Sequence, residues 1–210
     1  DVDVYRSRDW TVNLSANASF IKNKILKLPD QNKEGIISGN YKIVEGKSRY
    51  EFFLPTFVGV DRLTGNSMYT VDLEKNYIKT ETGSIIGNEG GTDITENVTK
   101  IGDTYYVNNT TYALKEFQGS ALPKVYGSFA GNISLSLSAM FTYSLGGKTY
   151  DGVYASLMST GSSPGNMHAD ILKSWKEAPA GMTETSTDRI DTKGIPQINN
   201  TMSTYNNATS

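Results

Sequence analysis

Hydrophobic and polar residues alternate with a period of two along residues 124–145. The apolar positions are Phe129, Ile133, Leu135, Leu137, Ala139, Phe141, Tyr143 and Leu145. The polar positions are Ser128, Asn132, Ser134, Ser136, Ser138, Thr142 and Ser144. Successive side chains of a β-strand point to opposite faces, so this period predicts strand rather than helix. Because the polar positions carry hydroxyls and amides but no charges, the pattern is typical of a barrel strand between lipid and a wet lumen.

Residues 10–20 show the same alternation and contain no charged side chain. Trp10 and Phe20 stand at the two ends, as aromatic residues do at membrane interfaces. The length matches the roughly 9–11 residues that a tilted strand needs to cross a bilayer, and residues 124–145 suffice for about two crossings. We therefore predict a barrel strand and a strand pair, while a soluble β-sandwich with one polar face remains the alternative.

The other segments read as long loops with local structure, 21–123 between these stretches and 146–210 after them. The elements predicted in the first loop are a short strand at 41–44, a hairpin of 50–60 and 67–71 around Asp61–Asn66, and a hairpin of 104–107 and 110–114 across Asn108-Asn109. In the second loop we predict one short helix, residues 166–177, capped by Asn166 and with His168 and Asp170 on its exposed side.

Composition narrows the chemistry that this chain can perform. It has 210 residues, a formal net charge of −2 and no cysteine. The charge gives no reason to expect nucleic acid as a partner, and disulfides or thiolate-bound metals are excluded within this sequence. His168 is the single histidine, so we expect no histidine-based triad or metal cluster. We expect no catalytic residues, no metal and no cofactor; a hydrolase would need two carboxyl groups about 5–10 Å apart in a cleft.

Aromatic residues are the candidates for contact with a substrate or a partner, because their rings stack on sugars and anchor proteins. The candidates lie in the two long loops and are Phe52, Phe57, Tyr150, Tyr154 and Trp175. The alternative is that these rings form small cores inside the loops themselves.

Four stretches in this order resemble segments of one family of transporters. The first is the alternating strand from Trp10 that leaves through Asn23-Lys24-Ile25. The second is Glu45-Gly-Lys-Ser-Arg-Tyr-Glu-Phe-Phe53, followed by Phe57-Val-Gly-Val-Asp-Arg-Leu-Thr-Gly65. The third is Gly119-Ser-Ala-Leu-Pro-Lys-Val-Tyr-Gly127, and the fourth is Phe141-Thr-Tyr-Ser-Leu-Gly-Gly-Lys-Thr-Tyr-Asp151. In order and spacing these stretches resemble the SusC/RagA family of TonB-dependent outer-membrane transporters, and the resemblance spans most of the chain.

The resemblance implies an all-β fold, with antiparallel strands of a large transmembrane β-barrel and long extracellular loops. It implies a place in the outer membrane of a Gram-negative bacterium, import of oligosaccharides or peptides, and a SusD-like surface lipoprotein as partner. Outer-membrane lipid would surround the strands, and TonB would act through an N-terminal part that this sequence lacks. A soluble β-rich glycan-binding module related to such a transporter is the alternative function.

Three departures from the family pattern set further expectations. No plug, no TonB-interacting segment and no aromatic-ended final strand are present, and about three bilayer-length strands fall short of the eight or more that close a barrel, so we expect a segment of a transporter. The short turn between the descending and rising strands is not recognisable at Ile133-Ser134-Leu135-Ser136, which predicts either one long strand or missing residues. Residues 72–119 lack the spacing of an acidic Asp-Gly loop, so no bound calcium is expected.

Overall fold

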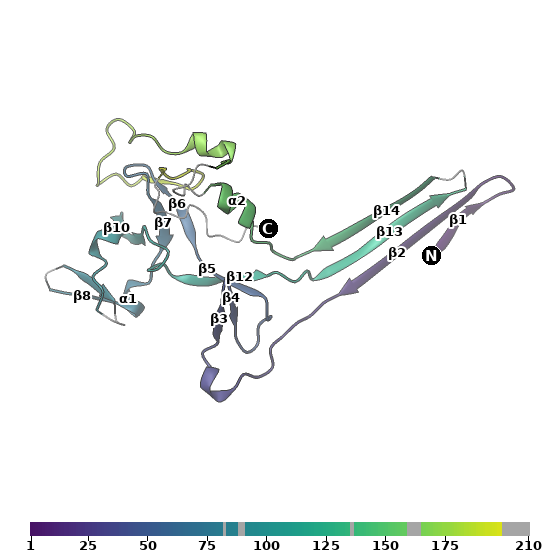
Figure 1. Ribbon diagram of the computed structural model, residues 1–210, viewed down its shortest axis with the longest axis horizontal. Coiled ribbons are helices and arrows are strands. Elements are labelled where there is room, and N and C mark those ends of the chain that lie inside the picture. The colour runs from purple at the N-terminus through teal and green to yellow at the C-terminus, as the bar shows by residue number, and fades with distance from the viewer. Residues whose placement is uncertain (82, 88–90, 135–136, 159–164, 199–210) are drawn as a thin grey trace. The chain divides into compact units, whose positions relative to one another are not determined.

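The computed structural model describes residues 1–81, 83–87, 91–134, 137–158 and 165–198. Strands dominate the chain and its helices are short (Figure 1), so the fold is all-β, as the alternation predicted. Leu135, Ser136 and residues 199–210, which the sequence predictions include, lie outside the described residues.

The chain divides into two compact units. Unit 1 comprises Asp1–Phe52 and Phe117–Thr149, and unit 2 comprises Phe53–Glu116 and the described residues from Tyr150 onward. The strands are β1 (Val2–Arg6), β2 (Thr11–Phe20), β3 (Ile36–Ser38), β4 (Tyr41–Ile43), β5 (Glu51–Pro55), β6 (Phe57–Asp61), β7 (Ser67–Thr70), β8 (Tyr77–Lys79), β9 (Ile85–Gly87), β10 (Val98–Ile101), β11 (Thr104–Val107), β12 (Lys115–Ser120), β13 (Val125–Ile133), β14 (Leu137–Leu145) and β15 (Ile190–Asp191). The helices are α1 (Leu73–Asn76), α2 (Gly152–Leu157) and the 3₁₀ turns Asp30–Asn32, Thr95–Asn97 and Ala169–Lys173.

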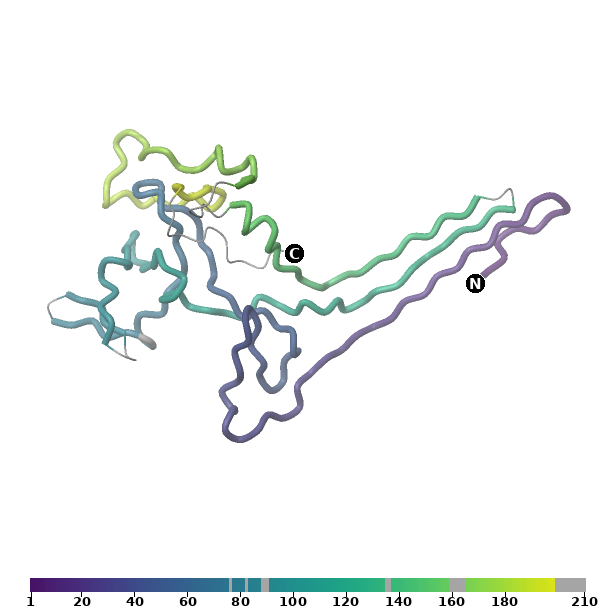
Figure 2. Tube along the Cα trace, viewed as in Figure 1, coloured from purple at the N-terminus to yellow at the C-terminus, as the bar shows by residue number. Residues whose placement is uncertain are grey.

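Unit 1 is built on a four-stranded antiparallel sheet in the order β1-β2-β13-β14. Strands β2, β13 and β14 are the long arrows that run side by side in Figure 1. Phe129 in the middle of β13 lies opposite Ala16 on one side and Phe141 on the other. Figure 2 shows that β13 ends and β14 begins at the end of this sheet where β1 ends and β2 begins.

The stretch 124–145 forms a hairpin, which corrects the expectation that it could be one long strand. Strand β13 ends at Ile133, which pairs directly with Leu137 at the start of β14. The chain therefore reverses between Ile133 and Leu137, and the expectation of one long strand is wrong. Ser134 closes this end, because its hydroxyl accepts a hydrogen bond from Thr11 N at 2.8 Å and its own N–H donates to Thr11 O at 3.0 Å.

The strand register brings the apolar positions of β2, β13 and β14 onto one face of the sheet and the polar positions onto the other. Even-numbered residues of β2 lie opposite odd-numbered residues of β13 and β14, so the apolar positions of all three strands coincide. The apolar face holds Val12, Leu14, Ala16, Ala18, Phe20, Val125, Gly127, Phe129, Gly131, Ile133, Leu137, Ala139, Phe141, Tyr143 and Leu145. The polar face holds Thr11, Asn13, Ser15, Asn17, Ser19, Ser128, Asn132, Ser138, Thr142 and Ser144, with Tyr126, Ala130 and Met140 as its exceptions.

Unit 2 contains a five-stranded sheet in the order β10-β11-β7-β6-β15. Its core is a cluster of buried side chains, Tyr69, Ile85, Ile94 and Val107. The predicted hairpin around Asp61–Asn66 is confirmed, since β6 pairs antiparallel with β7. Strand β5 ends at Pro55 and joins a different sheet, β12-β5-β4-β3, which agrees with a proline that cannot continue a central strand. The short strand predicted at 41–44 is β4.

The second predicted hairpin is wrong. Strand β11 pairs with β10 on one side and β7 on the other, and residues 110–114 form no strand. The tight turn lies at Gly102-Asp103, where Gly102 takes a positive φ of 60° that glycine adopts without strain. Asn108 is held elsewhere, because the Asn97 amide donates to its side chain at 2.9 Å.

The predicted helix at 166–177 is reduced to the 3₁₀ turn Ala169–Lys173, with His168 rather than Asn166 at its N-cap. Its apolar residues do not share a buried face, since Leu172 is 78% exposed. The turn ends at Ser174, whose hydroxyl donates back to Ile171 O at 2.6 Å; such local bonds compete with helix continuation. Helix α2, capped by the Asp151 carboxylate through Tyr154 N, was not anticipated.

Candidate functional site

The apolar face of the four-stranded sheet is open rather than packed against another layer of unit 1. Phe20 is 79% exposed, Phe141 57% and Leu145 60%. Phe129 and Phe141 stack on each other across the strands, with ring centroids 5.0 Å apart and planes at 18°. A continuous exposed surface of this kind marks a place where a protein meets lipid or another protein.

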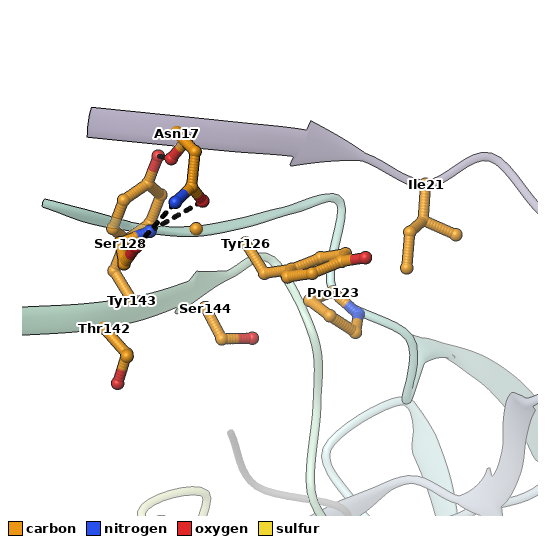
Figure 3. A pocket seen from close by; sticks show the side chains of 9 residues that line it. Asn17, Ile21, Pro123, Tyr126, Ser128, Thr142, Tyr143 and Ser144 are labelled. Carbon is orange, nitrogen blue, oxygen red and sulfur yellow. Dashed lines mark hydrogen bonds between the residues drawn. The ribbon is translucent and has the colours of Figure 1, made fainter. Parts of the chain in front are cut away.

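The polar face presents uncharged donors and acceptors instead. The amide of Asn17 donates to the Ser128 hydroxyl at 2.7 Å, and Ser128 N–H donates back to the Asn17 side-chain oxygen at 3.2 Å. These groups border a hollow of about 670 Å³ at the end of the sheet where β2 and β14 finish. Figure 3 shows the hydrogen bonds that join Asn17 and Ser128 on neighbouring strands, and the ring of Tyr126 beside Pro123. The lining offers hydrogen bonds to a neutral polar solute and no fixed charge.

Tyr143, one of the residues that line this hollow, links β2, β13 and β14. The Tyr143 side chain reaches from β14 across Gly127 of β13, and its hydroxyl donates to the backbone oxygen of Asn17 on β2 at 3.1 Å. Only glycine leaves space for this crossing, because a Cβ at position 127 would lie 2.1 Å from Asn17 O and 2.7 Å from the Tyr143 hydroxyl. An aromatic ring over a strand glycine also covers backbone that would otherwise be bare.

Gly127→Ala is therefore expected to destabilise the sheet by about 1–3 kcal/mol, the usual cost of overpacking. Gly131→Ala is the matched control, since its Cβ would meet only the flexible end of Leu14, at 3.3 Å. The free energy of unfolding in urea, measured on the full protein, compares the two variants. Equal costs at positions 127 and 131 would contradict the close packing of Tyr143.

In unit 2, the turn Asp61–Asn66 is held from inside by a buried ion pair. Arg189 and Asp61 are 3% and 0% exposed. The Arg189 Nε donates to Asp61 Oδ1 at 3.0 Å and its Nη2 to Oδ2 at 2.5 Å, a bidentate geometry. The same carboxylate accepts from Leu63 N–H at 3.0 Å and from the Thr64 hydroxyl at 2.9 Å.

The charge on Asp61 depends on this set of donors. Burial alone would raise the pKa of its carboxyl group, because it penalises the ionised form. The hydrogen bonds from Arg189, Leu63 N–H and Thr64 outweigh burial and hold the pKa below its ordinary value. Asp61 therefore stays ionised at neutral pH, and the turn is fixed as long as that charge remains.

Trp175 and Gln197 also hold the turn Asp61–Asn66, and we call these contacts together with the Asp61–Arg189 ion pair the clamp. The indole Nε1 of Trp175 donates to Arg62 O at 2.8 Å, and the indole ring covers Gly65, where a Cβ would lie 2.4 Å from the ring. The Gln197 side chain donates to the Asn66 side-chain oxygen at 2.9 Å, and Gln197 N–H donates to Gly65 O at 2.9 Å. A turn that lies at the surface in most hairpins is thus covered on two sides.

The structure places the other predicted contact residues in different surroundings. Phe52 is 2% exposed and stacks on Tyr41 at 4.7 Å. Phe57 packs edge-on against Tyr69 at 5.7 Å, beside the core of unit 2. Tyr150, half-buried, lies next to Gly152 at the start of α2. These rings are not gathered into one site, and their role in contacting a substrate or a partner stays a prediction.

Tyr154 belongs to a small polar cluster with the 3₁₀ turn. Its hydroxyl donates to Asp170 Oδ2 at 3.3 Å, and its ring meets His168 edge-on at 4.9 Å. Lys173 Nζ lies 2.6 Å from the other oxygen of Asp170. The prediction that His168 and Asp170 face outward is therefore only partly right, since Asp170 has a side-chain exposure of 29%. Among the described residues, no group of His, Cys, Asp and Glu is arranged to hold a metal ion.

Sequence reasoning missed Arg189, Tyr143 and Gly127 as organising residues. Arg189 stands in a polar stretch without periodicity and lies 128 positions from Asp61, so no local pattern singles it out. The pair Tyr143 and Gly127 carried a readable signal, because a glycine inside an alternating strand often marks a close approach of another group.

Comparisons with known proteins agree on the fold. The chain matches no family model and no curated protein. It is similar to a chain of the RagAB peptide transporter with a TM-score of 0.59 and 19% identity, over 83% of this chain and 17% of that one. It is also similar to chains of the RagAB peptide importer in the open-open and closed-closed states, each with a TM-score of 0.52, at 19% and 20% identity, over 93% of this chain and 19% of theirs.

These similarities establish the fold alone, because the identity is low and the shared part is small. The chain spans less than a fifth of the length of those solved chains. No helix in the described part of the chain is long and apolar enough to span a membrane.

Proposed function

We propose that this chain is a segment of a TonB-dependent nutrient importer in the outer membrane of a Gram-negative bacterium. The observation that carries the proposal is the two-faced sheet, exposed and apolar on one side and neutral and polar on the other. In this proposal β2, β13 and β14 are barrel strands whose apolar face meets outer-membrane lipid. Their polar face lines the lumen, where it contributes a neutral wall and no catalysis.

Strand length and the position of aromatic residues support this assignment. Strands β2, β13 and β14 have 10, 9 and 9 residues, close to the roughly 9–11 that one crossing needs. Trp10 precedes β2 and Phe20 ends it, and Tyr143 lies near the same end as Phe20. Rings at both ends of an apolar band are typical of membrane barrels. The similarity to parts of RagAB chains supports the same class of protein.

The remaining segments would be extracellular and would meet the partner and the nutrient. We assign residues 21–123 and 146–210 to long external loops of one barrel domain. A SusD-like surface lipoprotein would cover them, and an oligosaccharide or a peptide would pass beneath it. The solved neighbours import peptides, which favours a peptide. TonB would deliver energy through a part of the protein outside this chain.

In these loops, the clamped turn Asp61–Asn66 would keep one surface fixed while a nutrient passes. Tyr154 and Trp175 are the candidate contact rings that are only partly buried and lie in unit 2 beside polar groups. Tyr150, Phe57 and Phe52 would contribute through the shape of the loops that they pack. Passive contacts of this kind suit transport, in which a ligand has to bind and also leave.

Extraction of the native protein tests this function. Outer membranes are washed with high salt and then dissolved in a mild detergent, and the intact mass is measured together with co-purifying proteins. We expect the chain inside a protein several times larger, released only by detergent and accompanied by a lipoprotein. A free species of 23.0 kDa, recovered in the salt wash, would instead indicate the alternative glycan-binding module and would contradict the barrel.

A further inference from the structure

We infer that the hollow at the end of the polar face is a contact site for the nutrient, and that it takes an uncharged, apolar residue of a peptide together with the peptide groups beside that residue. The inference rests on the proposed function, because a nutrient reaches this face only if the face lines the lumen of an importer. It goes beyond that function by naming the residues that touch the nutrient and the part of the nutrient that they accept.

An exposed aromatic ring interrupts the polar face of β2, β13 and β14. It belongs to Tyr126, whose side chain is 44% exposed. The neighbouring positions on this face carry hydroxyls or an amide and are Asn17, Ser19, Ser128, Thr142 and Ser144. A wall that only had to hold water would need no ring here. Tyrosine offers a rigid apolar contact area at a low cost in conformational entropy, so we assign Tyr126 to contact with the nutrient.

One end of the hollow is apolar and is lined by Ile21, Pro123 and Tyr126. In Figure 3 these side chains lie toward one end of the group that is drawn, and Asn17 and Ser128 lie toward the other. Ile21 is 38% exposed and Pro123 is half-buried. The side chains of Ile21 and Pro123 can cover an aliphatic group, but they offer no hydrogen bonds to the hydroxyls around a sugar ring. This end therefore favours an apolar residue of a peptide over a saccharide.

The other end of the hollow presents hydrogen-bonding groups that are already oriented. The Asn17 amide donates to the Ser128 hydroxyl at 2.7 Å, and Ser128 N–H donates to Asn17 Oδ1 at 3.2 Å. The pair can still donate through the second amide hydrogen and the Ser128 hydroxyl hydrogen. Thr142 and Ser144 add exposed hydroxyls to the lining. Because Asn17 and Ser128 are held in place before a ligand arrives, they lose little freedom on binding a peptide group.

The distance between the two ends suits an extended peptide. Tyr126 and Ser128 lie two residues apart on β13, which corresponds to about 7 Å at the rise of a strand. An extended peptide covers a similar distance in two residues. A peptide residue whose side chain lies on Tyr126 therefore places the peptide groups next to it near Asn17 and Ser128.

Among the described residues, those that line the hollow carry no charge. Lys124 stands one rung farther out on the same face. Its stem lies against Gly146, where a Cβ would be 3.1 Å from Lys124 Cγ, and it does not line the hollow. A charged side chain of a nutrient would lose water here without gaining a counter-charge. The hollow therefore discriminates against charged residues, and its neutral contacts are weak enough to release a nutrient that has to move on.

Photochemical labelling of the full protein in an uncharged detergent tests this site. The probe is a short peptide with blocked ends and a diazirine analogue of leucine at its centre, and mass spectrometry of protein fragments maps where it attaches. We expect attachment at Ile21 and Tyr126. An excess of the same peptide with ordinary leucine should suppress the attachment. The peptide with lysine or glutamate in place of leucine, or a neutral trisaccharide, should not suppress it.

Three variants separate the ring from the rest of the face. Tyr126→Ser should lower attachment at Ile21 about fivefold at low probe concentration, since one aromatic contact changes an affinity by roughly two- to tenfold. Tyr126→Phe should retain the attachment, because the ring remains. The matched control is Met140→Ser, which removes another large side chain from the same face, 71% exposed and two rungs from Tyr126. It should leave the attachment unchanged.

Three results would overturn the inference and leave the barrel intact. They are no attachment in the hollow, equal loss in Tyr126→Ser and Met140→Ser, and equal suppression by the leucine peptide and by a charged peptide or the trisaccharide. Recovery of the wild-type protein without detergent would instead contradict the proposed function.

Discussion

Replacing Asp61 with asparagine is expected to destabilise unit 2 by about 3–5 kcal/mol, the largest effect in this molecule. The substitution keeps the shape of the side chain but leaves Arg189, which is 3% exposed, without its counter-charge. It also weakens the acceptor for Leu63 N–H and the Thr64 hydroxyl. Hydrogen exchange of the backbone amides across β6 and β7 in the full protein would measure the loss as faster local opening.

The control for this variant is Asp188→Asn. Asp188 pairs with Arg62 at 3.4 Å, but the two side chains are 74% and 39% exposed, and such surface pairs contribute about 0–1 kcal/mol. Replacing both buried partners, with Asp61→Leu and Arg189→Met, should recover much of the loss, because no unpaired charge then remains. If Asp61→Asn and Asp188→Asn opened the hairpin equally, the buried clamp would not be what holds it.

Low pH should weaken the ion pair between Asp61 and Arg189. The pKa of Asp61 lies below its ordinary value of 3.8 in the folded protein, so its contribution is fully present above about pH 4–5. It is lost as the pH falls through the lower, folded pKa. Opening of β6 and β7 should therefore be independent of pH near neutrality and rise in acid. In Asp61→Asn this part of the acid sensitivity should disappear.

Placing arginine at Phe141 is expected to cost about 2–4 kcal/mol in the assembled membrane protein. Phe141 lies at the middle of β14, opposite Phe129 and in line with Ala16 at the middle of β2. In the proposed barrel this rung is near the bilayer midplane, where a cation on the lipid face is most costly. Refolding of the full protein from urea into lipid vesicles would measure the difference.

Two matched variants separate the effect of the sheet face from the effect of depth in the membrane. Thr142→Arg changes the adjacent residue on the polar face and should cost little, because water in the lumen solvates the charge. Leu137→Arg lies on the apolar face but beside the turn, where the cost falls to about 0–1 kcal/mol. Equal costs at Phe141 and Thr142 would show that the two faces meet the same solvent and would exclude a lipid-facing sheet.

The strands of the sheet were predictable from sequence because each carries its own pattern. Period-two alternation indicates a strand with two different faces, and the pattern can be recognised without knowing which strands lie next to it. Register was not predictable, since Asn17 and Ser128 are 111 positions apart. The reversal between Ile133 and Leu137 could not be predicted, because no glycine, proline or asparagine stands between them. Its position is set by the pairing of Ile133 with Leu137.

The clamp in unit 2 consists of contacts that could not be predicted from the local sequence of the turn. The turn Asp61–Asn66 was predicted from its Asp, Gly and Asn residues, but nothing in that segment indicates burial. Burial comes from Arg189, Trp175 and Gln197, which arrive from a polar stretch without periodicity. The sequence predicts Trp175 as an aromatic contact within a helix. It lies beyond the 3₁₀ turn and covers Gly65.

The most direct test of the central claim, that this sheet separates lipid from a water-filled lumen, is a cysteine scan along β14. The chain has no cysteine of its own, so each introduced thiol reports one position. Residues 138–144 would be replaced singly and labelled in intact outer membranes with a water-soluble and a lipid-soluble maleimide. We expect strict alternation, with Ser138, Met140, Thr142 and Ser144 labelled from water and Ala139, Phe141 and Tyr143 from lipid. Labelling from water at every position would contradict a membrane-embedded sheet.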